Sequence, residues 1–187
     1  MRYIWAAIGL IRILLGTVLS LGMIKFTFPV KLEKNAILSR RKGGKINLGK
    51  HVSINHNASL AVTQNALLEI GSYSGVGENN VIVARERITI GNNVMIGPNV
   101  CIYDHDHVFR EPGTMRNLGY RTAPVTIEDN VWISAGVIIL KGVTIGTGSV
   151  IGAGTVVTHD IPPNSLVYGN RELVIRPRLI NDREGRQ

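Results

Sequence analysis

The densest group of chemically active side chains in this sequence lies between positions 104 and 121. Aspartate and histidine alternate at its start, in the order Asp104, His105, Asp106 and His107. An imidazole with a pKa near neutrality can take up and release a proton at cellular pH, and imidazoles and carboxylates can both bind metal ions. Further polar residues follow in the same segment: Arg110, Glu111, Arg116, Tyr120 and Arg121.

A six-residue repeat follows this polar segment and indicates the scaffold that must position it. A helix repeats every 3.6 residues and a strand every two, so neither explains a step of six. Such a step is typical of a parallel β-helix of hexapeptide repeats, in which three hexads make one triangular turn and residues about 18 apart stack. Large aliphatic residues stand at every sixth position: Ile127, Ile133, Ile139, Ile145, Ile151 and Val157. A second set stands four places after each: Val131, Val137, Val143, Ser149, Thr155 and Ile161.

The same step occurs earlier in the chain, for example from Leu48 to Ile54 to Leu60. We therefore predict an all-β domain over residues 46–180 with five to six turns, followed by a polar tail at 181–187. The step disappears over residues 103–124, which predicts one loop extruded from the β-helix. Long excursions from a rigid scaffold are where functional residues tend to gather.

Residues 1–45 have a different character. The stretch from Tyr3 to Ile24 is apolar apart from Arg12 and small or hydroxylated residues. As a helix of about 1.5 Å per residue it reaches roughly 31 Å, the thickness of a bilayer's hydrocarbon core. A basic flank up to Lys45 follows, which favours the cytoplasmic side and anionic headgroups. We expect attachment to the cytoplasmic face of a bacterial inner membrane, with a cytoplasmic protein as the alternative. Spanning, lying in the interface and capping the β-helix all stay open for the apolar segment.

The net charge of +8 lies entirely in this N-terminal part. Residues 1–45 hold nine basic residues and one acidic residue, and the rest of the chain holds twelve of each sign. A nucleic-acid surface needs cations spread along a face with aromatic stacking platforms, so we expect no nucleic-acid partner. The single cysteine, Cys101, cannot form an intrachain disulfide and is interpreted as a packing residue.

From about Ile88 to Arg176 the sequence resembles the hexapeptide-repeat acyltransferases of the left-handed β-helix superfamily. It is most similar to the branch that holds maltose, galactoside and nodulation-factor acetyltransferases and bacterial polysaccharide O-acetyltransferases. The left hand is implied by the resemblance alone, because the general rule for parallel crossovers predicts the opposite hand. The motifs that carry the resemblance are Pro98-Asn99-Val100, the loop histidine, Pro124-Val125-Thr126-Ile127, Asn130-Val131-Trp132-Ile133, Gly142-Val143-Thr144-Ile145-Gly146, Val150-Ile151-Gly152-Ala153-Gly154, Val157-Thr158 and Asp160-Ile161-Pro162-Pro163-Asn164.

The resemblance places the family's catalytic histidine on His107, the tenth residue counted from Pro98. In this family such a histidine is the general base that takes the proton from an acceptor hydroxyl, while the oxygen attacks the thioester of acetyl-CoA. His105 is the competing candidate, since two residues further back in an extended segment it points to the same side. Asp104 or Asp106 is expected to orient the imidazole.

The resemblance also implies contacts for acetyl-CoA, the expected cosubstrate, and for a saccharide acceptor. The sugar acetyltransferases have an acceptor-binding asparagine at a position that aligns near Gly77, so either Asn79 or Asn80 substitutes for it or the acceptor differs. His159 stands where relatives usually carry lysine, and Arg176 or Arg178 is the expected compensation. The predicted CoA contacts are Trp132, Ser134, Ala135, Gly152, Ala153, Thr158, His159 and Arg176. The predicted acceptor contacts are Asn79, Asn80, Asn99, Arg110 and Arg121.

We therefore predict a homotrimeric, acetyl-CoA-dependent O-acetyltransferase that needs no metal and acts on a surface polysaccharide or its lipid-linked precursor. Acetylation of an amino sugar or of serine is the enzymatic alternative, and a non-catalytic β-helix scaffold is a further one. The γ-class carbonic anhydrases share the fold, but their zinc needs three converging histidines. His51 and His56 lie far in sequence from His105 and His107, which disfavours that reading.

Overall fold

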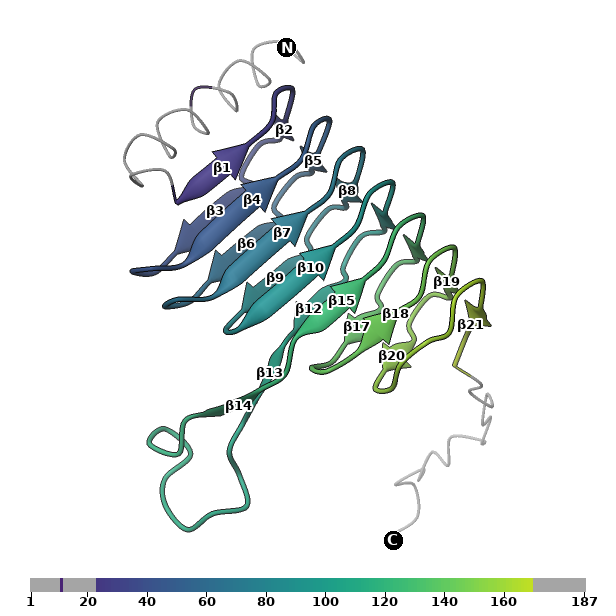
Figure 1. Cartoon of the computed structure of the whole chain (residues 1–187). Coiled ribbons are helices and arrows are strands. Elements are labelled where there is room, and N and C mark those ends of the chain that lie inside the picture. The colour runs from purple at the N-terminus through teal and green to yellow at the C-terminus, as the bar shows by residue number, and fades with distance from the viewer. Residues whose placement is uncertain (1–10, 12–22, 170–187) are drawn as a thin grey trace, which may run out of the picture.

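A computed structural model describes Ile11 and residues 23–169 of the chain. Most of the predicted apolar segment, Arg176 and the predicted tail lie outside these residues. Within them, no helix is long and apolar enough to cross a membrane. The described residues form a parallel β-solenoid whose strands stack into three sheets along one axis (Figure 1).

Each full turn of the solenoid contributes one strand to each sheet, which gives six turns of three strands and a final single strand. The first sheet contains β1 (Ile24–Phe26), β4 (Lys45–Leu48), β7 (Leu67–Ile70), β10 (Arg87–Ile90), β15 (Val125–Ile127) and β18 (Thr144–Ile145). The second contains β2 (Lys31–Leu32), β5 (Ser53–Ile54), β8 (Gly75–Val76), β11 (Met95–Ile96), β16 (Trp132–Ile133), β19 (Val150–Ile151) and β21 (Leu166–Val167). The third contains β3 (Ile37–Arg40), β6 (Ser59–Val62), β9 (Val81–Ala84), β12 (Cys101–Tyr103), β17 (Ile138–Ile139) and β20 (Val156–Val157).

The predicted 18-residue stacking holds only in the last turns, where Ile127 pairs with Ile145 and Ile133 with Ile151. The first turns are longer: Ile46 pairs with Leu68, 22 residues on, and Leu68 pairs with Ile88, 20 residues on. The cause is strand length, because the early strands of the first and third sheets hold four residues instead of two. This extra length explains the irregular six-residue step in the N-terminal half.

The solenoid begins at Ile24 and not near Ile46 as the hexads indicated. Ile24 pairs in register with Ile46, and Leu32 pairs with Ile54. Most of the basic residues between Lys25 and Lys45 therefore belong to the first turn and not to a flank before the domain. The many charges made this turn difficult to recognise in the sequence. In the structure the cations lie mostly at outward positions, and Ile24, Leu32 and Ala36 fill the interior.

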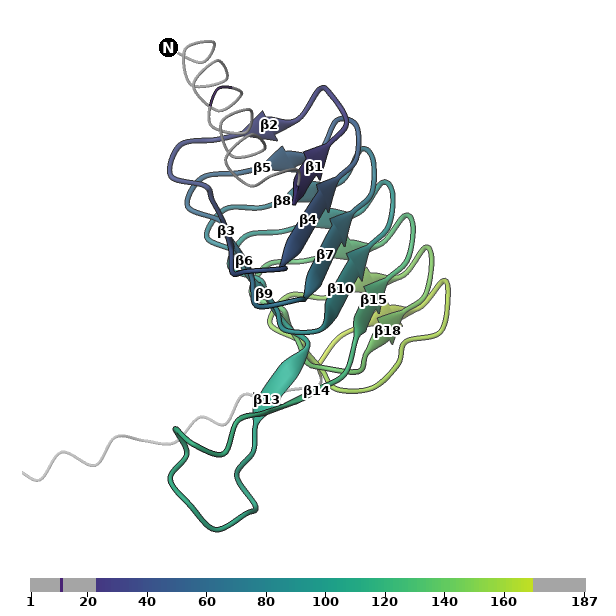
Figure 2. The ribbon, with the colours of Figure 1, turned by 60° about the vertical axis from the view of Figure 1, so that its left-hand side comes forward.

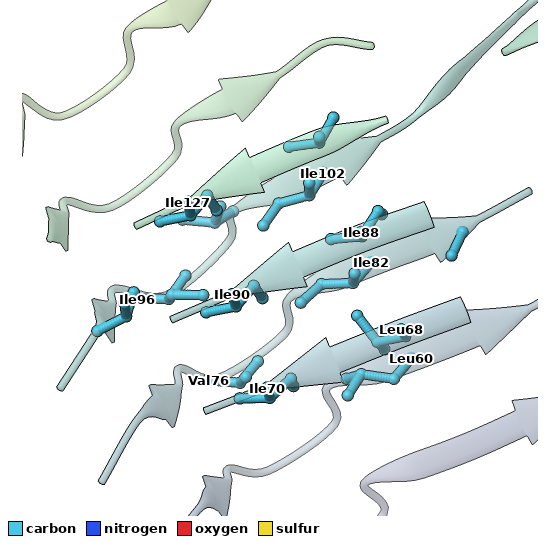
Figure 3. Close-up of a cluster of buried hydrophobic side chains, with 14 of the residues drawn as sticks. Leu60, Leu68, Ile70, Val76, Ile82, Ile88, Ile90, Ile96, Ile102 and Ile127 are labelled. Atoms are coloured by element: carbon cyan, nitrogen blue, oxygen red, sulfur yellow. The ribbon is translucent and has the colours of Figure 1, made fainter. Parts of the chain in front are cut away.

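The core is one continuous column of aliphatic side chains (Figure 3). All six predicted anchors from Ile127 to Val157 are buried, and five of the six residues four places later are buried as well. The sixth, Ile161, is partly buried against the same core. Burial of such side chains contributes about 1.5–3 kcal/mol each, so the column accounts for most of the fold's stability.

The corners between strands require a backbone conformation that favours asparagine and glycine. Among the residues that the structure describes, ten non-glycine residues have positive φ angles, and eight of them are asparagines. Asparagine tolerates the left-handed region better than most residues. Asn79 and Asn99, which the sequence places in the acceptor site, are two of these corner residues, with φ of 56° and 57°.

Between β12 and β15 the chain leaves the prism. Residues of this segment form β13 (His105–His107) and β14 (Tyr120–Thr122), which pair antiparallel with His107 opposite Tyr120. Figures 1 and 2 show this two-stranded ribbon projecting from the side of the solenoid. Both of the candidate histidines lie on its first strand.

Candidate active site

The ribbon is fixed at its base by contacts with neighbouring turns. The amide of Ala123 donates to the carbonyl of Asp104 at 2.9 Å, and the amide of Gly142 donates to the carbonyl of Ala123 at 3.1 Å. The ammonium of Lys141 lies 3.3 Å from the carboxylate of Asp106. These contacts give β13 a defined position next to the turn that contains β17.

Asp104 is completely buried, and its carboxylate organises the corner between β9 and β10. It accepts hydrogen bonds from the amides of Arg85 (2.9 and 3.0 Å), Glu86 (2.8 Å) and Arg87 (2.8 Å). Three amide donors stabilise the buried charge, because a buried carboxylate is tolerated only when its lone pairs are satisfied.

Asp104 also holds His105. The Nδ1 atom of His105 lies 3.1 Å from Asp104 Oδ1, and only 11% of the His105 side chain is exposed. A carboxylate that accepts from three amides can only accept from the ring, so Nδ1 carries the proton and Nε2 is left as the basic nitrogen. Asp104 therefore contacts the imidazole of His105 and not that of His107, the predicted base.

His107 lies in a different environment. Its ring is exposed and stands 4.4 Å, between centroids, from the ring of Tyr120. No hydrogen bond or ion pair joins the His107 side chain to another residue that the structure describes. Asp106, the other predicted partner, contacts Lys141 instead. The ring of Tyr120 touches both candidates, since its centroid is 5.5 Å from that of His105.

Arg85 completes this cluster and was not predicted from the sequence. Its guanidinium carbon lies 3.3 Å from the centroid of the Tyr120 ring, a cation–π contact. The Arg85 Nε atom is buried, and no described residue accepts from it. The interruption of the hexads by Arg85, Glu86 and Arg87 was the one sign in the sequence, but it does not show that this corner meets the ribbon.

Tyr103 contributes a further ring beside His105. The two rings meet edge to face with centroids 5.8 Å apart. Burial raises the pKa of the Tyr103 phenol, and the neighbouring Cys101 raises it further. The phenol therefore stays neutral at cellular pH and adds no charge to the histidine environment.

A cavity of about 260 Å³ opens next to His107. It lies between the ribbon and the turn that carries Lys141, and Arg110 and Arg121 belong to its lining. The two predicted acceptor-binding arginines are therefore brought to the same cavity as His107. The residues that line it are Asp106, His107, Val108, Phe109, Arg110, Arg121 and Lys141.

The three predicted asparagines take structural roles in the coils. Asn80 is a correction: its side chain is buried and accepts from the amide of Val100 at 2.7 Å, so it faces the core and not an acceptor. Asn79 accepts from the side chain of Asn57 at 3.2 Å, within a ladder of corner asparagines. The positive φ angle of Asn99 places it at the next corner along.

His51 and His56 lie in the early turns and contact other groups. The ring of His51 stacks on Tyr73 at 4.9 Å, and Nε2 of His56 lies 3.7 Å from Glu33. Among the described residues, no group of three or more histidine, cysteine or acidic side chains could hold a metal ion.

Known proteins share this architecture and much of this sequence. The family described as bacterial transferase hexapeptide (six repeats) matches residues 124–159. A putative colanic acid biosynthesis acetyltransferase of Escherichia coli K12 is 33% identical over 146 residues, which cover 77% of this chain and 75% of that protein. This chain belongs to the hexapeptide-repeat acetyltransferase family. The galactoside O-acetyltransferase of E. coli K12 is 44% identical over 121 residues, 63% of this chain and 56% of that protein.

A solved hexapeptide-repeat acetyltransferase from Vibrio cholerae, in complex with acetyl-CoA, is 39% identical over 55% of each chain, with a TM-score of 0.51. The chain spans about half the length of several curated relatives that it matches.

The residues predicted to contact CoA, apart from Arg176, lie on the late turns. Trp132 is on β16 with 48% of its surface exposed, and it pairs with Met95 on β11, which is also exposed. Thr158 and His159 are exposed and joined by a 2.8 Å hydrogen bond near the last corners. Ser134, Ala135, Gly152 and Ala153 lie at partly or fully exposed corners between these two places.

Proposed function

We propose that this chain is an acetyl-CoA-dependent O-acetyltransferase whose acceptor is a saccharide, with His107 as the general base. The observation that carries the proposal is that the exposed imidazole of His107 lines a cavity together with the two predicted acceptor-binding arginines. Relatives named as galactoside O-acetyltransferase and as a colanic acid biosynthesis acetyltransferase support a sugar acceptor.

The chemistry requires no covalent acyl-enzyme. Acetyl-CoA supplies an activated thioester, and the residues on the late turns that would hold it are Trp132, Ser134, Gly152 and Thr158. A neutral His107 takes the proton of the acceptor hydroxyl while that oxygen forms the new C–O bond, and the C–S bond breaks. The imidazolium then returns the proton to the departing thiolate, so atoms and charge balance.

His105 and Tyr120 are proposed to support this base. His105, fixed by Asp104, and Arg85 both contact the Tyr120 ring, and that ring contacts His107. A base whose ring is held by packing needs less reorganisation in the transition state. In the competing assignment, His105 is the base and acts through its Nε2, and its contact with Asp104 supports this role. Mutating each histidine in turn distinguishes the two assignments.

The test is thiol release from acetyl-CoA with a panel of glycans, lipid-linked sugars and amino sugars, in detergent. We expect His107→Ala to lower kcat by about 10²–10⁴-fold. His105→Ala is expected to have the smaller effect. The reverse order would make His105 the base. No thiol release with any acceptor, together with no CoA binding by calorimetry, would leave the scaffold alternative. Acetylation restricted to amino sugars would identify an N-acetyltransferase.

We further propose that the protein works as a left-handed, trimeric β-helix at the cytoplasmic face of the membrane. Exposed cations on the first turn and at the start of the second support the membrane contact, since anionic headgroups attract such clusters by about 1 kcal/mol per residue. These cations are Lys25, Lys31, Lys34, Arg41, Lys42 and Lys45. Flotation of the full chain with anionic and with neutral vesicles tests the contact, and light scattering in detergent tests the trimer. Equal flotation with both vesicles would argue against the cations.

A further inference from the structure

The cavity beside His107 is lined by three cations. Arg110 and Arg121 come from the ribbon and its loop, and Lys141 comes from the turn after β17. Because these side chains belong to segments far apart in the sequence, only the folded chain brings their charges to one place.

Their charges are only partly neutralised. Asp106 is the one carboxylate in the lining, and it lies 3.3 Å from Lys141. Arg121 has Glu111 at 3.4 Å, but both side chains are about 60% exposed, and exposed pairs of this kind interact weakly. Arg110 stands 5.5 Å from the ring of Phe109 and, among the residues described, pairs with no carboxylate. The cavity therefore keeps a net positive charge next to the histidine.

The volume of the cavity limits the size of the group that can bind inside it. At about 260 Å³ it lies below the usual range of roughly 300–1,000 Å³ for drug-sized ligands. This volume accommodates one sugar residue with a small charged group. Arginine guanidinium groups bind carboxylates and phosphates through two parallel hydrogen bonds, so an oxyanion matches this lining.

We propose that this cavity binds an anionic group on the acceptor, either the carboxylate of a uronic acid or the phosphate of a sugar phosphate. Arg110 and Arg121 hold the oxyanion, and Lys141 supplies further positive charge while its contact with Asp106 fixes the cavity wall. An acceptor held in this way presents a hydroxyl of the same sugar to His107. This inference rests on the proposed transferase function and narrows its acceptor to an acidic saccharide.

The experiment compares acceptors in which one group of the sugar is exchanged for an anion. Methyl glucuronide, methyl glucoside, methyl galacturonide, methyl galactoside and glucose 1-phosphate are each assayed for thiol release from acetyl-CoA. We expect the wild type to prefer the anionic member of a pair by about tenfold or more in kcat/KM. Whether a uronide or glucose 1-phosphate is the better acceptor distinguishes a carboxylate from a phosphate. The preference is expected to weaken as salt rises, because the arginines are exposed.

Arg110→Gln tests the cavity arginine that pairs with no carboxylate among the described residues. We expect it to lower the ratio of anionic to neutral kcat/KM about tenfold and to leave the KM for acetyl-CoA unchanged. The matched control is Arg116→Gln, which removes an exposed arginine of the same loop that does not line the cavity. The control is expected to keep the wild-type ratio.

Other results would overturn the inference. Equal use of anionic and neutral acceptors by the wild type, or an equal loss with both in Arg110→Gln, would reject the acidic acceptor and keep the transferase. A raised KM for acetyl-CoA in Arg110→Gln would assign the cavity to a CoA phosphate. If no acceptor released thiol, the proposed function would fail, and saturation-transfer NMR with methyl glucuronide and glucose 1-phosphate would decide about the cavity. Binding that is lost in Arg110→Gln supports an anion site, and no binding rejects it.

Discussion

The Nδ1 atom of His105 lies 3.1 Å from a carboxylate oxygen of Asp104, and that carboxylate also accepts from three consecutive backbone amides of the preceding turn. One buried side chain therefore connects the corner between β9 and β10 to the strand that carries both histidines. The position of the candidate site depends on the same group that stabilises the coil.

Removal of Asp104 should cost stability as well as activity. Asp104→Ala leaves three amides without their acceptor at a buried position, and we expect a loss of about 2–4 kcal/mol in the free energy of unfolding. Chemical denaturation followed by circular dichroism measures it. Asp106→Ala is the matched control, because the exposed Asp106–Lys141 pair should contribute less than about 1 kcal/mol. Equal losses in the two variants would contradict the structural role of Asp104.

The Tyr120 ring is predicted to position His107 by packing and not through its hydroxyl. Tyr120→Phe keeps the ring between Arg85 and the histidines, so its kcat should stay within about twofold of wild type. Tyr120→Ala removes contacts that aromatic pairs and cation–π pairs make at roughly 0.5–1.5 kcal/mol each, and we expect kcat to fall about tenfold. The KM for acetyl-CoA should not change. A large loss in Tyr120→Phe would instead show that the phenol takes part directly.

Trp132 should matter for CoA and not for folding. Its side chain is about half exposed, so Trp132→Ala should change the free energy of unfolding by less than about 1 kcal/mol. We expect the Kd for CoA, measured by calorimetry, to rise about tenfold or more. Val156→Ala, which shortens another exposed apolar side chain on the third sheet, is the control. A wild-type Kd in Trp132→Ala would remove this residue from the CoA site.

Close stacking of the turns predicts a strong effect at Gly71. A Cβ atom at this position would lie 2.5 Å from the carbonyl carbon and oxygen of Gly91. Because these are backbone atoms, the clash cannot be relieved by moving a side chain of the neighbouring turn. We expect Gly71→Ala to lower the free energy of unfolding by about 2 kcal/mol or more. At Gly169 an added Cβ meets nothing within 4 Å, so Gly169→Ala should leave the stability nearly unchanged. Thermal melts of the two variants measure the difference. Similar melting temperatures for both variants would contradict the close approach.

The six-residue repeat was enough to predict the solenoid. A step of six from Ile127 to Val157 leaves no other regular structure that buries every anchor, and the structure buries them all. It did not determine where the coils begin. Four-residue strands lengthen the early turns and disturb the repeat there. Ile24 belongs to the first sheet, but the cations that follow it in the chain resemble a basic flank outside the domain.

The site divides in the same way. The sequence was enough to identify the histidines and aspartates as candidate site residues, because they lie in a polar segment that interrupts the six-residue repeat. The burial of the polar residues Asp104 and Asn80 could not be predicted from the sequence, because their hydrogen-bond partners lie 17 to 20 positions away. Asp104 accepts from the amides of Arg85 to Arg87, and Asn80 accepts from the amide of Val100. Arg85 meets Tyr120, and Lys141 meets Asp106, because the stacking of turns brings each corner beside the ribbon. A sequence pattern records which residues face inward, but contacts between turns depend on the length of every turn and exist only in the folded chain.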